Sequence, residues 1–375
     1  MDLQLQKLYA GIEDFPKYLA DYIDGFVSKQ GKQQGMGNED EVTEIFDVLN
    51  LTAQRDAFLH FYEIALKNRL LGKETFFEDV EQNFRSRLSQ LFGETQIMKV
   101  KGMINDVVTS KDSLHKFKEY VNSRKERKEV LENKSLDILL LTKANWPTEA
   151  LVTDVCKMPQ EIERIGKEFS NYYTGNIVGR KIEWLLNEGF CEVKASFKAG
   201  PKNLNLSVIQ LSILSVLDAS LTKSRVFSDL MDATKINKKL VRQHLTPLIK
   251  SKLVKREKGD MDPIDEAEKY SINIDFQSKS RMLMLLPKKT LKGRDKKADN
   301  DSIQDNRKNV IEAAIVRIMK SNKKLEFIGL ANEVRKICEH FPPADRALRQ
   351  MLDDLIKREY LERDSANMNM YIYKA

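Results

Sequence analysis

The sequence contains few of the side chains that build disulfide frameworks or metal sites. Among its 375 residues there are three cysteines and four histidines. The cysteines (Cys156, Cys191 and Cys338) are odd in number and far apart, which argues against a disulfide framework and favours a reducing compartment. The histidines show no metal-ligand spacing either. We therefore expect neither a metal site nor a cofactor in this chain.

Long apolar runs are also missing. No stretch of about eighteen apolar residues occurs, so the sequence predicts no membrane-spanning helix. Residues 1–10 lack the basic and apolar regions of a secretory signal, and we expect none. A Ser–His–Asp pattern, a glycine-rich phosphate loop and an HExxH motif are absent as well. These absences favour a non-catalytic protein over an enzyme.

Charged residues, by contrast, are abundant. They make up 32% of the chain, beside 41% hydrophobic residues, which is typical of a globular, helix-rich protein. The net charge of +7 and the pI near 9.0 permit an acidic partner, either nucleic acid or the acidic tail of a protein. Net charge alone does not distinguish these two partners. The length of the chain indicates about two to four folded units.

Periodicity along the chain predicts a mainly α fold with small β content. We expect a helical bundle at 1–125, an α/β subdomain at 126–205, a first winged helix at 206–287, a linker at 288–308 and a C-terminal winged helix at 309–375. The linker is expected because its residues are almost all polar.

Local patterns place individual elements. Ser110 is expected to cap the start of a helix. Strands are predicted over 136–141, 181–186 and 190–197 from their apolar and β-branched content. A small sheet with an open edge can also accept a strand from another chain, with main-chain hydrogen bonds giving affinity.

The winged-helix prediction rests on an internal repeat. Residues 240–257 (LVRQHLTPLIKSKLVKRE) and 347–364 (ALRQMLDDLIKREYLERD) align at an offset of 107. Each copy has apolar residues at helical spacing, then a short apolar strand, a polar loop and a second strand.

Winged helices often place a helix in a DNA groove. In the second copy, however, Asp353 and Asp354 stand beside Lys357 and Arg358 on that helix. Carboxylates facing a groove weaken attraction to phosphate, so nucleic-acid binding is the less favoured function.

One lysine near the C-terminal end of the chain stands out by its position. If residues 310–320 form a helix, Val310, Ile311, Ile315 and neighbouring apolar residues share one face, and Lys320 falls opposite Ile311. An ammonium group held in solvent on a rigid helix suits covalent modification by a ubiquitin-like protein. Any surface lysine has similar exposure, so the pattern alone leaves both interpretations open.

An ordered set of motifs resembles the C-terminal region of the cullins and covers nearly the whole chain. The motifs are FLHFYEIALKNRLL at 58–71, KVKGMINDVVTSKDSLHKFKEY at 99–120, ILLLTKANWP at 138–147, MPQEIERI at 158–165, FSNYYTGNIVGRKIEWL at 169–185, QLSILSVLD at 210–218, AAIVRIMK at 313–320 and LIKREYLERD at 355–364.

This resemblance implies a ubiquitin-ligase scaffold. In cullins the region binds an Rbx-type RING protein, whose N-terminal strand joins the α/β sheet and whose zinc-bearing RING recruits a ubiquitin-conjugating enzyme. Lys320 matches the lysine that accepts the neddylation modifier, and its modification would release the last winged helix and the RING from a closed arrangement. A basic surface of Lys279, Arg281, Lys288 and Lys289 is the expected contact for an acidic tail of the conjugating enzyme.

The resemblance also implies a ligase for the modifier, a cullin exchange or inhibitor protein and a deneddylase as partners, in the cytoplasm and nucleus. The N-terminal stalk that holds the substrate receptor in cullins is missing, so we expect a C-terminal fragment or a minimal relative. Two alternatives stay open: a cullin-like subunit of the anaphase-promoting-complex type, which would lack the neddylation motif, and a winged-helix nucleic-acid-binding protein.

Overall fold

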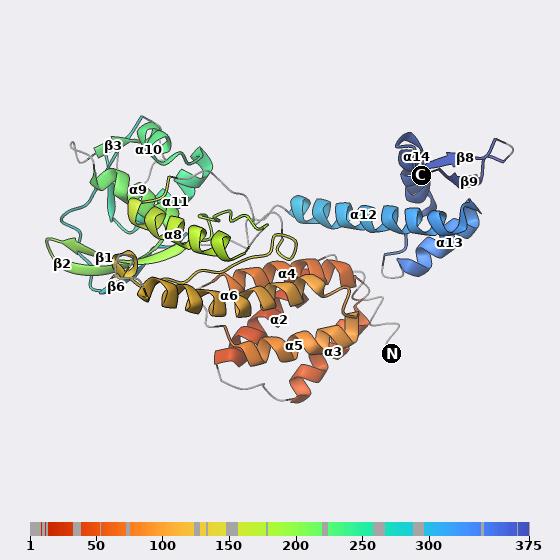
Figure 1. Ribbon diagram of the computed structural model, residues 1–375, viewed down its shortest axis with the longest axis horizontal. Coiled ribbons are helices and arrows are strands. Elements are labelled where there is room, and N and C mark those ends of the chain that lie inside the picture. Colours follow the sequence, from red (N-terminus) through yellow and green to blue (C-terminus); the bar gives the residue numbers. More distant parts are fainter. Residues whose placement is uncertain are drawn as a thin grey trace. The chain divides into compact units, whose positions relative to one another are not determined.

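The structure is a computed structural model of the chain (Figure 1). It describes residues 9, 12, 14–32, 39–52, 54–72, 76–123, 128–132, 134–147, 157–177, 179–219, 224–257, 267–287, 296–338, 341–365 and 367–374. The mainly α fold with small sheets is confirmed. The chain divides into two compact units, one combining Met1–Ile104 with Thr290–Ala375 and the other formed by Asn105–Lys289.

The N-terminal part of the first unit is built from helices. They are α2 (Phe15–Lys32), α3 (Glu39–Leu51), α4 (Arg55–Leu70), α5 (Glu78–Phe92) and the start of α6 (Met98–Asn122). Aromatic rings fill the core between them, and the rings of Phe58 and Phe92 stack at 5.9 Å. Arg69 is buried among these helices and donates to Glu81 at 2.8 and 3.1 Å. Its charge is thereby paired where water is excluded, which a buried guanidinium requires.

Helix α6 is continuous, so the expected helix start at Ser110 is wrong. Ser110 lies in mid-helix, buried, and its hydroxyl donates to the carbonyl of Asp106 at 2.5 Å. A serine whose hydroxyl bonds back one turn can continue a helix instead of capping one. The boundary between the two units falls within this helix.

The second unit begins with a cluster that joins α6 to α7 (Lys128–Leu131) and α8 (Gln160–Asn176). Phe117 of α6 meets Phe169 of α8 edge to face at 5.1 Å. The predicted strands over 136–141 and 181–186 are wrong, because neither segment pairs with a strand among the described residues. Side chains from both segments nevertheless pack against this cluster.

A three-stranded sheet follows, in the order β1-β2-β6. Strand β1 (Phe190–Phe197) confirms the prediction over 190–197 and forms an antiparallel hairpin with β2 (Gly200–Ser207). Gly200 closes this hairpin with a φ of 107°, which a residue with a side chain rarely adopts. Strand β6 (Met282–Met284) runs parallel to β2.

The internal repeat corresponds to two winged helices of the same topology. The first contains α9 (Val208–Asp218), β3 (Ser224–Val226), α10 (Phe227–Thr234), α11 (Lys238–Lys250), β4 (Val254–Arg256) and β5 (Lys269–Ile272); the second contains α12 (Lys296–Asn322), β7 (Lys324–Glu326), α13 (Phe327–Ile337), α14 (Asp345–Lys357), β8 (Leu361–Arg363) and β9 (Met370–Tyr373). Their sheets have the matching orders β3-β5-β4 and β7-β9-β8.

The repeat extends to the backbone. Lys252 and Glu359, which are related by the offset of 107, both adopt a positive φ (62° and 64°) where the helix turns into the first wing strand. Sequence periodicity gave no sign of β3 and β7, because three residues are too few to show alternation.

The expected linker at 288–308 is wrong over its second part, because α12 begins at Lys296. Ile303 is buried, and Arg307 donates to the carboxylate of Asp56 on α4 at 2.5 and 3.0 Å. A polar stretch can therefore be helical when a few residues anchor it, which composition alone does not reveal. Residues 288–295 lie outside the described residues.

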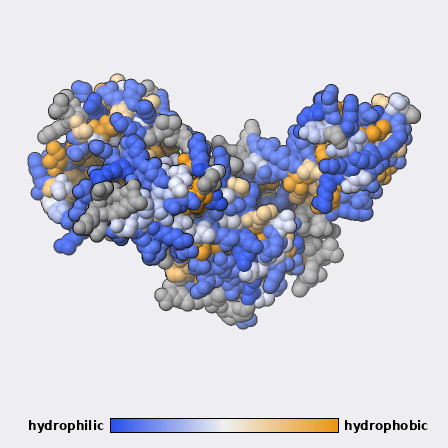
Figure 2. Space-filling view, viewed as in Figure 1, coloured by the Kyte–Doolittle hydropathy of each residue, from blue (hydrophilic) through white to orange (hydrophobic). Residues whose placement is uncertain are grey.

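Hydrophobic side chains gather in the cores of these parts. Hydrophilic residues dominate the face shown in Figure 2, and hydrophobic ones appear there as small separate areas. None of the helices in the described ranges has the length and apolar character needed to cross a membrane.

Candidate functional site

Helix α12 presents Lys320 to solvent. Ile311, Ile315 and Met319 on its opposite face are buried against the core of the second winged helix, and Lys320 itself is exposed in the last turn. The predicted buried face holds except at Val310, whose side chain is 47% exposed. Val310 lies at the edge of the apolar arc, one position before the core begins at Ile311. Lys320 therefore stands on a rigid helix with its charged end in water.

Two further lysines follow Lys320 closely, and both are engaged by the wing sheet. The Lys323 ammonium lies 5.2 Å from the ring centroid of Tyr373, within the range of a cation–π contact. Its backbone is held in the left-handed region, with a φ of 63°. Lys324 opens β7 and forms an ion pair with Asp364. For Lys320, no ion pair or hydrogen bond of the ammonium joins it to another described residue.

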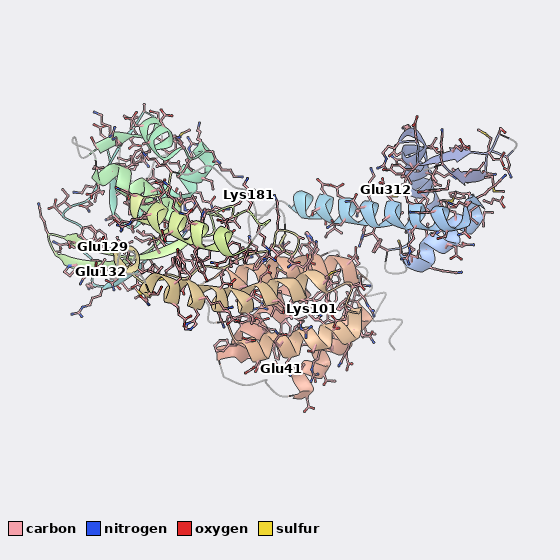
Figure 3. All side chains as sticks on the ribbon, in the orientation of Figure 1. Glu41, Lys101, Glu129, Glu132, Lys181 and Glu312 are labelled. Atoms are coloured by element: carbon pink, nitrogen blue, oxygen red, sulfur yellow. The ribbon has the colours of Figure 1, made fainter. Side chains whose placement is uncertain are left out.

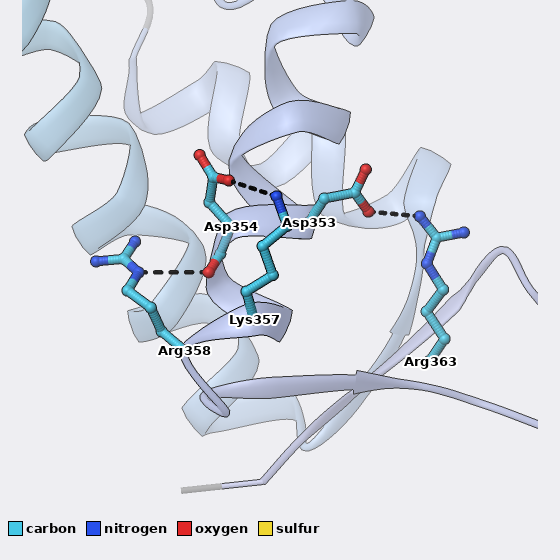
Figure 4. A network of polar contacts seen from close by, with 5 residues as sticks. All are labelled: Asp353, Asp354, Lys357, Arg358 and Arg363. Atoms are coloured by element: carbon cyan, nitrogen blue, oxygen red, sulfur yellow. Dashed lines mark hydrogen bonds and ion pairs between the residues drawn. The ribbon is translucent and has the colours of Figure 1, made fainter.

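Several ion pairs within the second winged helix involve residues of α14, the helix that would enter a DNA groove (Figure 4). Asp353 pairs with Arg363 at 2.7 Å, and Asp354 pairs with Lys357 at 3.5 Å. Arg358 donates to Glu312 of α12, labelled in Figure 3, at 2.6 Å, and this hydrogen bond raises the pKa of Arg358. Cations that are already paired with carboxylates attract phosphate weakly, so this surface gives little support to DNA binding.

The predicted basic surface is described only in part. Lys279 and Arg281 are exposed on the segment that leads into β6, whereas Lys288 and Lys289 lie outside the described residues. The carbonyl of Arg281 accepts from the amide of Asn203 at 2.9 Å, which fixes this segment beside β2. Lys202 of β2 donates to the carbonyl of Ser278 at 2.8 Å.

Two further lysines of the same unit, Lys198 and Lys255, lie near one carboxylate. Asp275 accepts from Lys198 at 2.7 Å and lies 3.8 Å from Lys255, and the hydrogen bond from Lys198 lowers the pKa of this carboxyl. The carboxylate offsets part of the positive charge of these two lysines. Lys279 and Arg281 have no such ion pair with a described residue, so their charges are available to meet an acidic partner.

Two segments of the second unit have the side-chain pattern of strands without a strand partner. In 136–140, Leu136, Ile138 and Leu140 pack on the cluster of α6 and α8, while the residues between them are exposed. In 181–184, Ile182 and Trp184 do the same, and Lys181, labelled in Figure 3, is exposed.

Backbone amide and carbonyl groups in these two segments lack hydrogen-bond partners in the backbone of other described residues. No backbone hydrogen bond joins residues 135–139 or 181–184 to any other described residue. Backbone amide and carbonyl groups are normally paired when they are withdrawn from water, so such edges are able to accept another strand. We call the segments 135–139 and 181–184 the open edges.

Helix α6 fixes one end of the first open edge. The Asp106 carboxylate accepts from the amide and hydroxyl of Thr142 at 2.7 and 2.9 Å and from the indole of Trp146 at 2.8 Å. Ser110 accepts from the amide of Leu140 at 2.7 Å. Sequence patterns did not indicate these anchors, because the partners lie 30 to 40 residues apart in the chain.

The described residues contain no group of three or more His, Cys, Asp and Glu side chains placed to hold a metal ion. The buried histidine of the first winged helix, His244, is instead part of the packing. Its Nδ1 lies 2.7 Å from the hydroxyl of Ser207, and burial lowers the pKa of His244 to about 4. A neutral imidazole paired in this way stabilises the packing of the first winged helix.

Models of cullin domains match three stretches of the chain. The cullin alpha solenoid domain matches residues 7–114, the cullin alpha+beta domain matches residues 140–276, and the cullin protein neddylation domain matches residues 306–367. Lys320 and both of its lysine neighbours lie inside the last of these matches.

Curated relatives align along almost the whole chain. Cullin-3B of Arabidopsis thaliana is 29% identical over 371 residues, which covers 96% of this chain and 49% of the relative. Cullin-3A of the same plant is 30% identical over 90% of this chain and 45% of the relative. Cullin-4A of Mus musculus is 28% identical over 95% and 46%. The chain thus spans about half the length of the curated relatives it matches.

Proposed function

Because this chain belongs to the cullin family, we propose that it acts as the RING-binding scaffold part of a cullin–RING ubiquitin ligase and is activated by neddylation of Lys320. The observation that carries the proposal is the pair of open edges beside a rigid core. The exposure of Lys320 within the segment that matches the neddylation domain supports the modification site.

The open edges suit an added strand from an Rbx-type RING protein. An incoming strand would bond to backbone groups that have no partner among the described residues. Its alternating side chains would pack beside Trp184, which is only partly buried at the edge of the cluster. The anchors from Asp106 and Ser110 hold the first edge in position before binding, which lowers the entropy lost on complex formation.

In this proposal the chain contributes by position and supplies no catalytic group. The RING protein brings its own zinc and recruits the ubiquitin-conjugating enzyme, while the scaffold holds the reactants together and raises their effective concentration. Lys279 and Arg281 would attract an acidic tail of that enzyme through long-range charge. The exchange or inhibitor protein, the deneddylase and the location in cytoplasm and nucleus belong to the same proposal.

Co-expression with an Rbx-type RING protein, followed by a neddylation reaction in vitro, tests this function. We expect a stable complex and a single added modifier on the wild type. The variant Lys320→Arg should form the complex and lose nearly all of the modification, because arginine keeps the charge but offers no acceptor amine at this position. Lys308→Arg is the matched control, since Lys308 is exposed on the same helix, and it should be modified like the wild type.

The possible failures are distinct. A stable complex without modification would keep the scaffold and remove Lys320 from its role. Modification of Lys320→Arg at the wild-type rate would place the acceptor elsewhere. Failure to form any complex with the RING protein would refute the proposal and favour nucleic-acid binding instead. Measuring DNA affinity as a function of salt tests that alternative, which predicts that the affinity falls steeply as salt is added.

A further inference from the structure

Three lysines lie within five residues at and just after the end of α12, but their side chains have different partners. Lys320 is exposed in the last helical turn, and its side chain has no polar partner among the described residues. Lys323 is held over the ring of Tyr373. Lys324 is tied to Asp364, and its side chain is 50% exposed, so burial does not keep it from solvent.

The wing sheet fixes both neighbours through backbone and side chain. The carbonyl of Lys323 accepts from the amide of Tyr373 at 2.8 Å, and its own amide donates to Met319 at 2.8 Å. Lys324 pairs in register with Ile372 of β9, and its ammonium reaches the carboxylate of Asp364 just after β8. The Asp364 side chain is only 16% exposed, so it has little freedom to follow the lysine away from the sheet.

We propose that the second winged helix selects its own acceptor lysine, with Asp364 withholding Lys324 and Tyr373 withholding Lys323, so that a modifier is transferred to Lys320. This inference rests on the proposed function and adds a specificity-determining residue to it. Asp364 acts on a competing lysine and touches neither the modifier nor Lys320, so it is a positioning residue.

Isopeptide-bond formation depends on the partner of the lysine ammonium, because the reacting group is the free amine. A lysine amine, having lost a proton to solvent, attacks the carbonyl carbon of the modifier's C-terminal thioester. A C–N isopeptide bond forms, the C–S bond breaks, and the cysteine thiol of the carrier enzyme leaves. An ammonium that is paired with a carboxylate must first leave its partner and move away from the sheet, whereas Lys320 has neither step to make.

The test compares acceptor use in the full chain bound to its RING partner. In the background of Lys320→Arg, we expect Asp364→Asn to raise the rate of modification at Lys324 by about two- to fivefold, the range for a partly exposed ion pair. Adding Lys324→Arg should abolish the gain. Mass spectrometry of the modified peptide identifies the site. Asp364→Glu keeps the charge and should keep Lys324 withheld.

Glu362→Gln is the matched control, because it removes one carboxylate from the same sheet. Glu362 lies on β8, 4.0 Å from Lys374, and the register places it on the same face as Lys324 with β9 between them. It should leave the rate at Lys324 unchanged. Thermal melting of each variant reports whether the winged helix is still folded.

A chemical probe that needs no enzyme separates the two proposals. Acetylation of the unmodified chain by an N-hydroxysuccinimide ester should label Lys320 faster than Lys324, and Asp364→Asn should raise labelling of Lys324 by about two- to fivefold. Equal rates at Lys324 with and without Asp364, in either assay, overturn the inference. A wild type that is never enzymatically modified removes the proposed function, and with it the selection of an acceptor, even if the probe still reports shielding.

Discussion

Replacing Asp106 with alanine removes the anchor that holds the first open edge to α6. The carboxylate accepts hydrogen bonds from the amide and hydroxyl of Thr142 and from the indole of Trp146, which is 2% exposed. Hydrogen bonds to a charged group contribute about 1.5 to 3 kcal/mol each, and a buried donor left without a partner adds its desolvation penalty. The three bonds share one acceptor and are not additive, so we expect the second unit to lose about 3 to 5 kcal/mol.

Tryptophan fluorescence measures this loss directly. The chain has two tryptophans, Trp146 and Trp184, and both belong to the second unit, so urea unfolding followed by their emission reports on that unit. Asp112→Asn is the control, because Asp112 is exposed on the same helix and its replacement should change stability by less than about 0.5 kcal/mol.

The same variant should weaken binding of the RING protein. If α6 positions the first open edge, a detached edge must be ordered on binding, and the binding free energy becomes less favourable by the cost of that ordering. A pull-down at temperatures where the variant is folded separates this effect from unfolding. A loss of stability below about 1 kcal/mol would refute the anchor role given to Asp106.

Two further predictions concern the first winged helix. Burial lowers the pKa of His244 from its usual 6.5 to about 4, so the unfolded chain takes up a proton between these values while the folded chain does not. Stability should therefore fall by about 3 kcal/mol as the pH drops from 6.5 to 4, and His244→Gln should flatten this dependence in urea unfolding whereas His115→Gln should not. Glu268→Ala removes the carboxylate that accepts from Arg256, where the two side chains are 0% and 2% exposed, and should cost about 1.5 to 3 kcal/mol; a change below about 1 kcal/mol would contradict the buried pair.

The repeated part of the fold could be read from the sequence because its signal is local and occurs twice. Leu245 and Leu352, related by the offset of 107, are both fully buried, and so are Tyr270 and Tyr371 on the second wing strands. Helical periodicity marks such residues directly. The exposed position of Lys320 followed from the same pattern, since one face of α12 is apolar at its end.

Contacts between distant residues could not be read in this way. The acceptor for Trp146 lies 40 residues earlier, and the partner of Lys324 lies 40 residues later. Neither Asp106 nor Asp364 belongs to a spacing motif, because each position is set by the packing of elements whose separation along the chain is arbitrary. Composition also failed for the first turns of α12, where Ile303 and Arg307 anchor a stretch that otherwise resembles a linker.

The two segments wrongly predicted as strands differ from strands in their pairing and not in their side-chain pattern. Their alternation is present in the structure, since Ile138 and Leu140 face the core while Leu139 is exposed. A strand needs a second strand as well as alternation, and no other described segment pairs with either one. An alternating pattern reports which face is buried and leaves the source of the pairing strand open. In the proposed complex that strand comes from the RING protein, so amide hydrogen exchange at Leu139 should slow on binding, and unchanged exchange would mean that the pairing strand lies elsewhere.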